Sequence, residues 1–406
     1  MARYLGTFAA GICAVAAGPS VVAFLIHPAS RDHFAFRASG EAVWHGNYAG
    51  AFTPTGFWLP HPYPPTTFPL MAILAALPVR VGYLVTVLSQ IIALGLAIRI
   101  MERTFCRHST YRHIVRFLII SSPAYAFTIA AGQVSATHAL LMAWVLVAWH
   151  EGRETTAGFA LGLLCLEKPQ LGLVFLPLAV LVRGWRLAAT AIGVGMMGVL
   201  GTLPSVGLNT WRAWLEAATA LDEHAHHDLI LRLGTTWYAW CRIANWGVLA
   251  WGLPVVPAAV ALVCAWRRPG RERYALAILF VLLGNVHVLH YDAALLGGLA
   301  AYLVSTRMAM LGAIVSFLML ALGSMVARPV LATPALALWF GMLFADLMGT
   351  PATTDTAPRS PVEKSWSWSR TLGRHLVGGH KPTRRPERHA RIPHYSDWSR
   401  RSATAP

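Results

Sequence analysis

Lys168 is the only lysine among the first 350 residues, and it lies between Glu167 and Pro169 in the middle of an apolar stretch. An ammonium group is costly to bury in such a stretch, so we expect it to face a protein-lined cavity. Two interpretations stay open. The ammonium binds an anionic group such as a phosphate, with Arg31 and Arg37 as alternative ligands, or it forms a structural ion pair with Glu167 or a neighbouring helix.

Asp32 follows the first apolar segment and lies near the start of a loop, residues 27–65, that is rich in Gly, Pro and aromatic residues. A charged side chain at the edge of an apolar segment, next to such a loop, is a candidate functional group. The alternative is that Asp32 caps a helix that begins near His33.

Two further polar groups interrupt apolar segments. Gly132-Gln133 lies between two of them, where Gln133 either hydrogen-bonds a ligand or the first outer loop (27–65), or belongs to an ordinary polar turn. His290 and Asp292 begin another such segment, where Asp292 either contacts a ligand or caps a helix.

The densest group of potential metal ligands is the segment 222–228, with the sequence DEHAHHD. Histidine and carboxylate groups are ordinary metal ligands, but this spacing matches no known metal site. We therefore predict no metal, and we interpret the segment as a solvated polar loop or as a contact for a substrate.

The composition indicates the kind of molecule that holds these groups. Of the 406 residues, 56% are apolar and only 12% are charged, about half of the roughly 25% typical of soluble domains. So few charges cannot cover the surface of a soluble protein of this size. We predict an all-α polytopic membrane protein, a bundle of about 10 to 13 transmembrane helices with short helices in its outer loops.

The net charge of +16 would suggest a nucleic-acid partner in a soluble protein. Here arginines gather in short loops between apolar segments, as is typical of the cytoplasmic side, so we predict no nucleic-acid partner. The first outer loop (27–65), a second outer loop (205–243) and the region of His290 must then face outward. Seven of the 13 acidic residues before residue 351 lie in these outer segments.

Two apolar stretches are too short for a simple span. Residues 66–78 cover less than the roughly 30 Å of hydrocarbon. Residues 157–182 must begin and end in the cytoplasm, yet they are about one span long and carry Lys168-Pro169 in the middle. We expect two half-helices that meet at a polar turn around a protein-lined cavity.

The transmembrane domain is predicted to end near residue 350. Residues 351–406 contain 11 Lys and Arg against four Asp and Glu, with no apolar periodicity. We expect a disordered cytoplasmic tail whose basic residues contact anionic lipid headgroups.

Several motifs occur in a specific order along residues 1–300. They are Asp32-His33-Phe34, the Ala/Gly/Tyr stretch 42–48, Tyr63-Pro64-Pro65, Gly132-Gln133 and Lys168-Pro169. This succession resembles glycosyltransferase family 87, the polyprenyl-phosphate-mannose-dependent mannosyltransferases of the GT-C fold. The sequence departs from the family pattern at His33, which separates the aspartate from the aromatic residue.

The resemblance implies transfer of a hexose, expected to be mannose, from a polyprenyl-phosphate donor to a glycan or lipid acceptor. The reaction is expected on the outer side of a bacterial-type plasma membrane, with inversion and without a cofactor. Because a phosphate departs without protonation, one carboxylate that deprotonates the acceptor is enough, unlike the pair of a glycoside hydrolase. The implied roles are catalytic base for Asp32, phosphate binding for Lys168, Arg31 and Arg37, and pocket residues for His33, Tyr63, Gln133, His290 and Asp292.

The alternative function is a secondary transporter or flippase of a polyisoprenoid or a small solute. Broken helices and an intramembrane lysine are typical of transporters. Against this alternative, the acidic residues crowd one face instead of the middle of the membrane.

Overall fold

The computed structural model describes residues 2–26, 31–52, 63–105, 111–182, 184–220, 234–268, 270–285, 288–326 and 328–349. The histidine-rich segment 222–228 and the basic tail 351–406 lie outside the described residues, so the predictions made for them remain predictions. The described residues form 17 α-helices and no strand. The predicted all-α architecture is confirmed.

The described part of the chain consists of α-helices and three 3₁₀ turns. They are α1 (Ala2–Ile26), α2 (Arg31–Trp44), η1 (Ala49–Phe52), η2 (Pro65–Thr67), α3 (Phe68–Ala76), α4 (Val79–Phe105), α5 (Arg112–Ile120), α6 (Pro123–Ala131), α7 (Ser135–His150), α8 (Glu154–Glu167), α9 (Pro169–Leu181), α10 (Trp185–Val206), α11 (Leu208–Ala220), α13 (Trp237–Ile243), α14 (Gly247–Trp266), α15 (Glu272–Gly284), α16 (His290–Tyr302), α17 (Arg307–Met325), η3 (Pro329–Ala332) and α18 (Thr333–Gly349).

Several of these helices can cross a membrane. Within the described ranges, α4, α10, α17 and the helix Pro329–Gly349 are long and apolar enough, and the pair α5 and α6, bent by 43°, is a fifth candidate. Shorter apolar helices of 10 to 17 residues, such as α7 and α9, accompany them, and the count of 10 to 13 spans remains a prediction. The chain is an integral membrane protein of the polytopic all-α class.

The hairpin of α8 and α9 has the geometry expected of two half-helices. Its helices have 14 and 13 residues, or about 20 Å each, which is shorter than the roughly 30 Å hydrocarbon core. The only residue between them is Lys168, and Pro169 occupies the first position of α9, where the missing N–H costs no helical hydrogen bond. The predicted break at Lys168-Pro169 is confirmed.

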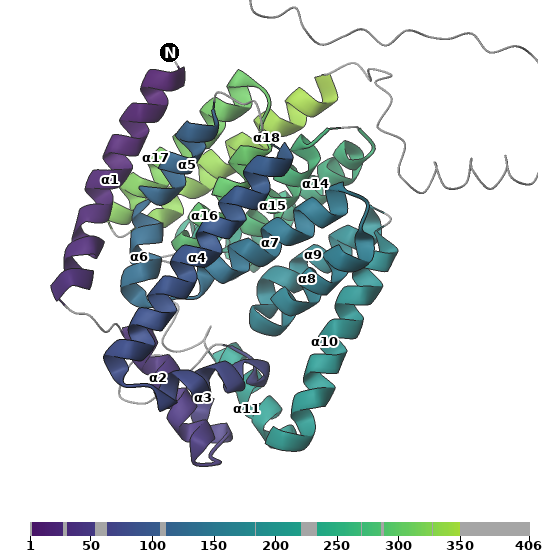
Figure 1. The fold of residues 1–406 in the computed structure, drawn as a ribbon. Coiled ribbons are helices and arrows are strands. Elements are labelled where there is room, and N and C mark those ends of the chain that lie inside the picture. The colour runs from purple at the N-terminus through teal and green to yellow at the C-terminus, as the bar shows by residue number, and fades with distance from the viewer. Residues whose placement is uncertain are drawn as a thin grey trace, which may run out of the picture. The chain divides into compact units, whose positions relative to one another are not determined.

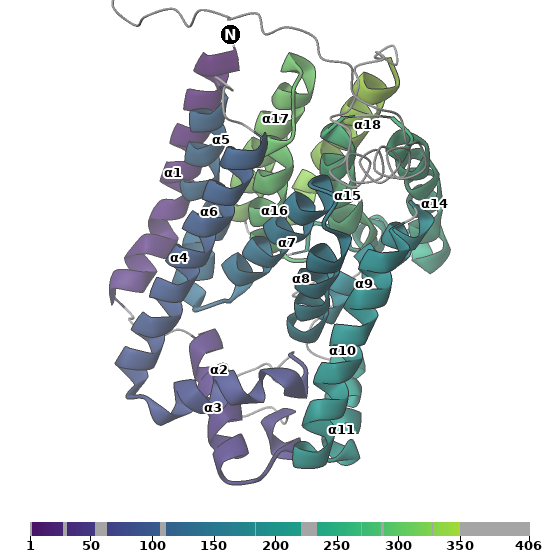
Figure 2. The same ribbon diagram turned by 45° about the vertical axis from the view of Figure 1, so that its right-hand side comes forward.

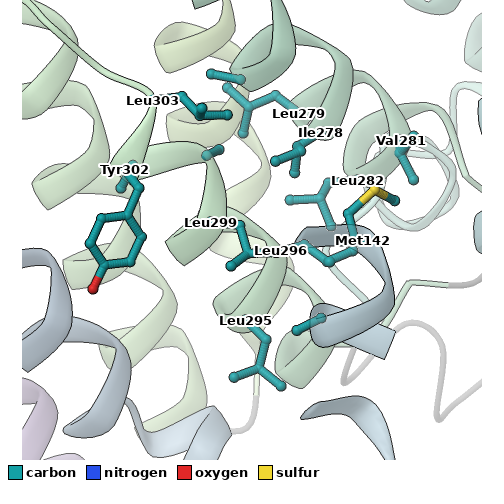
Figure 3. Packing of buried hydrophobic residues seen from close by; sticks show 14 of the residues in the cluster. Met142, Ile278, Leu279, Val281, Leu282, Leu295, Leu296, Leu299, Tyr302 and Leu303 are labelled. Carbon is teal, nitrogen blue, oxygen red and sulfur yellow. The ribbon is translucent and has the colours of Figure 1, made fainter. Parts of the chain in front are cut away.

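Helix α16 lies at the centre of the bundle. Every one of its side chains is buried, including the charged Asp292, and Figure 3 shows its apolar face packed with side chains of α7 and α15. A charged side chain on such a helix must find a partner inside the protein. Figure 3 labels Leu296 and Leu299 of α16, together with Met142 of α7 and Ile278 and Leu282 of α15.

A layer of short helices covers the end of the bundle that lies away from the N-terminus. Figures 1 and 2 show α2, α3 and α11 together at this end, and α2 contacts both α3 and η1. Gly40 allows α2 to approach α3 closely, because a side chain there would overlap the carbonyl of Met71. This close packing holds the first turn of α2, which contains Asp32, against the bundle.

Candidate active site

Asp32 is the second residue of α2, so it lies within the first turn of the helix rather than at its cap position. Its Oδ2 atom accepts a hydrogen bond of 2.5 Å from Nε2 of Gln133. A negative charge in the first turn also interacts favourably with the helix dipole. Two candidates from distant parts of the sequence therefore meet.

The turn that carries Gln133 has a fixed backbone. Helix α6 ends in Gly132, whose positive φ of 66° is a conformation that favours glycine. From α4, the hydroxyl of Tyr83 donates to the carbonyls of Ile129 and Ala130 at 3.2 and 3.1 Å. The Ile129 carbonyl also accepts from the N–H of Gly132 at 3.1 Å, so the single hydroxyl proton of Tyr83 adds a shared contact to the carbonyls at the end of α6.

Gln90 of α4 holds the other side of the same turn. Its Oε1 atom accepts from the N–H of Ala136 at 2.9 Å, and its Nε2 donates to Thr137 at 3.0 Å. It thereby caps the start of α7, which has no side-chain cap from its own N-cap residue. Sequence reasoning missed Gln90, although a glutamine inside a long apolar segment was a signal.

Tyr63 extends the chain of contacts from Asp32. Its hydroxyl donates to Oε1 of Gln133 at 3.2 Å, and the side chain is buried. Burial raises the pKa of Tyr63 well above its ordinary value, and the negative charges of Asp292, Asp32 and Glu167 raise it further. Tyr63 therefore stays protonated at neutral pH and can donate to Gln133.

Lys168 forms a buried ion pair with a neighbouring helix. Its Nζ lies 2.5 Å from Oδ2 of Asp292, the two side chains are 5% and 1% exposed, and Nζ also lies 5.5 Å from the ring centroid of Tyr291. The structural alternative considered for Lys168 is thus realised with Asp292 and not with the adjacent Glu167. Sequence reasoning missed Tyr291, the residue between two predicted site residues.

Hydrogen bonds from two loops hold the break between α8 and α9. The hydroxyl of Thr66 donates to the carbonyl of Leu166 at 2.7 Å, and the amide of Asn285 donates to the carbonyl of Gln170 at 2.6 Å. These carbonyls lie on either side of Lys168. The loop that contains Tyr63 and the loop before α16 are therefore both attached to the break.

A second polar pair, also missed from the sequence, lies beside Tyr63. Nε2 of His138 in α7 is 3.6 Å from Oε2 of Glu167, and the ring centroids of His138 and Tyr63 are 6.1 Å apart. A histidine in the first turn after Gln133, within an apolar stretch, was the available signal.

Arg37 does not join the cluster. It forms an ion pair of 2.9 Å with Glu41 and also donates to the carbonyl of Leu77. At about 100° per residue, a side chain five positions after Asp32 points about 140° away from it around the helix. The predicted role of Arg31 concerns a side chain outside the described residues.

The two predicted pocket histidines lie in different surroundings. His33 is buried between α2 and α4, where its ring centroid lies 5.4 Å from that of Tyr83. His290 is buried on α16, with its ring centroid 5.0 Å from that of Phe127. His290 thus lies two positions before Asp292 of the ion pair, whereas His33 packs against Tyr83, which contacts the end of α6.

Tyr63 connects the two parts of the site. Its hydroxyl bonds Gln133, the partner of Asp32, and its pKa responds to the charge of Asp292, the partner of Lys168. Among the described residues, no group of three or more His, Cys, Asp or Glu side chains could hold a metal ion. The described side chains of the site can accept a proton through a carboxylate, form hydrogen bonds through Gln133 and Tyr63, and bind an anion through Lys168.

Comparison with known proteins identifies the family. The sequence model of Glycosyltransferase family 87 matches residues 61–296, more than half of the chain. The match includes Tyr63, Gln133, Lys168 and Asp292 but begins after Asp32. Neither the curated proteins nor the solved structures include a match to this chain. The chain belongs to glycosyltransferase family 87 and is a membrane glycosyltransferase.

Proposed function

We propose that this enzyme transfers a hexose, mannose, from a polyprenyl-phosphate donor to a glycan or lipid acceptor on the outer side of the plasma membrane. The observation that carries the proposal is the hydrogen bond between Asp32 and Gln133, taken together with the buried pair of Lys168 and Asp292. Such a site combines a proton acceptor with a cation, and a sugar phosphate donor requires both.

The reaction is a direct displacement. The acceptor oxygen attacks the anomeric carbon, the bond between that carbon and the phosphate oxygen breaks, and the configuration inverts. Asp32 takes the proton of the acceptor hydroxyl, and polyprenyl phosphate leaves as an anion. Because the phosphate needs no proton to leave, one base is enough.

Gln133 and Tyr63 orient the base. The amide N–H of Gln133 fixes the direction of the Asp32 carboxylate and stabilises its ionised form. Tyr63 in turn donates to the carbonyl oxygen of the same amide. This bond orients the amide so that its NH₂ group faces Asp32. The carboxylate is thus oriented before the acceptor hydroxyl binds, which reduces the entropy cost of orienting it during the reaction.

Lys168 is suited to the phosphate. An ammonium group has three donors, and the bond to Asp292 occupies one of them. The remaining donors are available to phosphate oxygens, whose growing negative charge they stabilise as the bond to the sugar breaks. Asp292 holds the ammonium in place when no donor is bound.

The outer side is supported by the arrangement of the helices. Asp32 belongs to the helical layer at the end of the bundle opposite the N-terminus (Figures 1 and 2). The arginine-rich loops place the N-terminus in the cytoplasm under the positive-inside rule. A donor and an acceptor would then meet at the outer membrane surface.

Family membership favours this function over the transporter alternative, and one assay separates the two. The purified protein is placed in liposomes with labelled polyprenyl-phosphate mannose, the glucose and arabinose counterparts, and total lipid extract as a source of acceptors. We expect a labelled product with mannose only, and nuclear magnetic resonance of the product should show the inverted anomeric configuration. Movement of the intact donor across the bilayer without any labelled product would contradict the proposal.

A further inference from the structure

The pair of His138 and Glu167 is the polar feature of the site that the proposed mechanism does not use. His138 lies in the first turn of α7, five residues after Gln133, and its side chain is 1% exposed. Glu167 is the last residue of α8, next to Lys168, and its side chain is 35% exposed. The two groups come from separate helices and face each other across 3.6 Å.

Both members of the pair lack hydrogen bonds. Neither ring nitrogen of His138 has a hydrogen-bond partner, and no hydrogen bond from a described residue reaches Glu167. Buried polar groups normally have such partners, because an unmade hydrogen bond costs free energy. A buried histidine without such a partner, next to a partly accessible carboxylate, is therefore a candidate contact for a ligand.

Other carboxylates in the same fold show what Glu167 lacks. Each of the following accepts a hydrogen bond from a nearby side chain: Glu102 from Arg116 and Tyr302, Glu272 from Ser305, Asp292 from Lys168, and Asp346 from Thr306. Glu167 lies 3.6 Å from His138, whose ring centroid is 6.1 Å from that of Tyr63, yet it accepts no such bond from a described residue.

The chemistry of a carboxylate restricts what that donor can be. An ionised carboxylate only accepts hydrogen bonds, so it repels a phosphate and binds a hydroxyl or a cation. The described residues offer no third metal ligand beside this pair. A sugar hydroxyl remains as the group that fits.

We propose that Glu167 binds a hydroxyl group of the transferred sugar and that His138 positions its carboxylate. The inference rests on the proposed function. Lys168, the next residue, turns toward Asp292 while Glu167 turns toward His138, so the phosphate and the sugar of one donor molecule can contact neighbouring residues. The bond from Thr66 to the carbonyl of Leu166 holds this part of α8 in place.

The test combines variants with donor analogues. Transfer by the full-length protein is measured with the mannose donor and with its 2-, 3-, 4- and 6-deoxy analogues. The proteins are the wild type, Glu167→Ala, Glu167→Gln and the control Glu151→Gln, which changes an exposed carboxylate paired with Arg153. Loss of a hydrogen bond to a charged group should lower kcat/KM about 10- to 100-fold.

The expected result is a specific coupling. For the wild-type enzyme, kcat/KM should fall by about 10- to 100-fold with one of the deoxy donors. Glu167→Ala should show the same fall with the complete mannose donor. Its kcat/KM should not fall further when that deoxy donor is used. His138→Ala should weaken the coupling, and His138→Gln should restore part of it. Glu151→Gln should behave as the wild type with every donor.

Two contrary outcomes are distinguishable. Losses that multiply independently for all four analogues would overturn the role of Glu167 while leaving the proposed function intact. A wild-type enzyme that uses none of the polyprenyl-phosphate donors would overturn the proposed function and this inference with it. Glu167→Gln has nearly the volume of the native residue, so it keeps the test valid if Glu167→Ala does not fold.

Discussion

The side-chain amide of Gln133 donates a hydrogen bond to the carboxylate of Asp32, although 101 positions separate the two residues in the chain. The bond joins the first turn of α2 to the turn between α6 and α7. It connects the covering layer of short helices to the interior of the bundle. A change on either side should therefore alter the position of the candidate base.

Replacing Asp32 by Asn should remove activity without unfolding the protein. The amide has the size of the carboxylate but cannot accept the proton of an acceptor hydroxyl, and general base catalysis contributes about 10²- to 10⁴-fold. We expect a loss of that size in kcat with labelled polyprenyl-phosphate mannose. Glu41→Gln, on the same helix, is the control and should retain its rate, and normal turnover of Asp32→Asn would exclude Asp32 as the base.

Replacing Gln133 by Ala should lower kcat about tenfold with little change in KM, because the base loses its orientation but stays in place. The lost amide donor also stabilised the ionised carboxylate, so the acidic limb of the pH profile should move to higher pH. Tyr63→Phe, which only removes the donor to the Gln133 carbonyl oxygen, should have a smaller effect in the same direction. An unchanged pH profile in Gln133→Ala would mean that the bond has no role in catalysis.

Replacing one partner of the Lys168–Asp292 pair should destabilise the protein. Lys168→Met leaves the charge of Asp292 buried and unpaired, which costs about 3 to 5 kcal/mol in folded proteins. The double variant Lys168→Met with Asp292→Asn should regain much of the thermal stability but remain inactive, because no cation faces the phosphate. Thermal unfolding in detergent and donor turnover measure the two effects separately.

The exposed pair of Arg153 and Glu151 is the control for this experiment. Its removal should change stability by no more than about 1 kcal/mol, as is usual for surface ion pairs. A double variant that regains both stability and turnover would show that the Lys168–Asp292 pair has only a structural role.

The stability of the protein should fall on acidification through His33. Burial lowers the pKa of His33, Arg37 lowers it further, and a contact with the backbone of Val79 partly offsets the shift. Below the ordinary histidine pKa near 6.5, the unfolded chain binds a proton that the folded protein binds less well. The free energy of unfolding is therefore largest above that pH. It declines below that pH, by at most about 1.4 kcal/mol per pH unit. The unfolding temperature should therefore drop less in His33→Asn than in wild type between pH 7.5 and 5.5, whereas the exposed His45→Asn should drop as much as wild type does.

The sequence predicts local breaks well and long-range partners poorly. Proline at residue 169 and the length of the surrounding stretch were enough to predict the break at Lys168. The partner of Lys168 was not predictable, because Asp292 lies 124 positions away and their contact depends on how α16 packs against the hairpin. The orientation of Arg37 is predictable once Asp32 and Arg37 are known to belong to one helix. The helical period of about 3.6 residues then directs the two side chains to different sides of that helix.

Gln90 provides a test of whether the turn that carries Gln133 must be held from α4. Gln90→Leu keeps the apolar volume but leaves the N–H of Ala136 without its acceptor, which costs about 1 to 3 kcal/mol for a buried group. We expect a lower unfolding temperature and, in the protein that remains folded, a lower kcat because Gln133 shifts away from Asp32. Ile92→Val, which removes one methyl group from an exposed side chain of the same helix, is the control and should change neither quantity. If Gln90→Leu loses stability but keeps the wild-type kcat, the turn is fixed by Gly132 and Tyr83 alone.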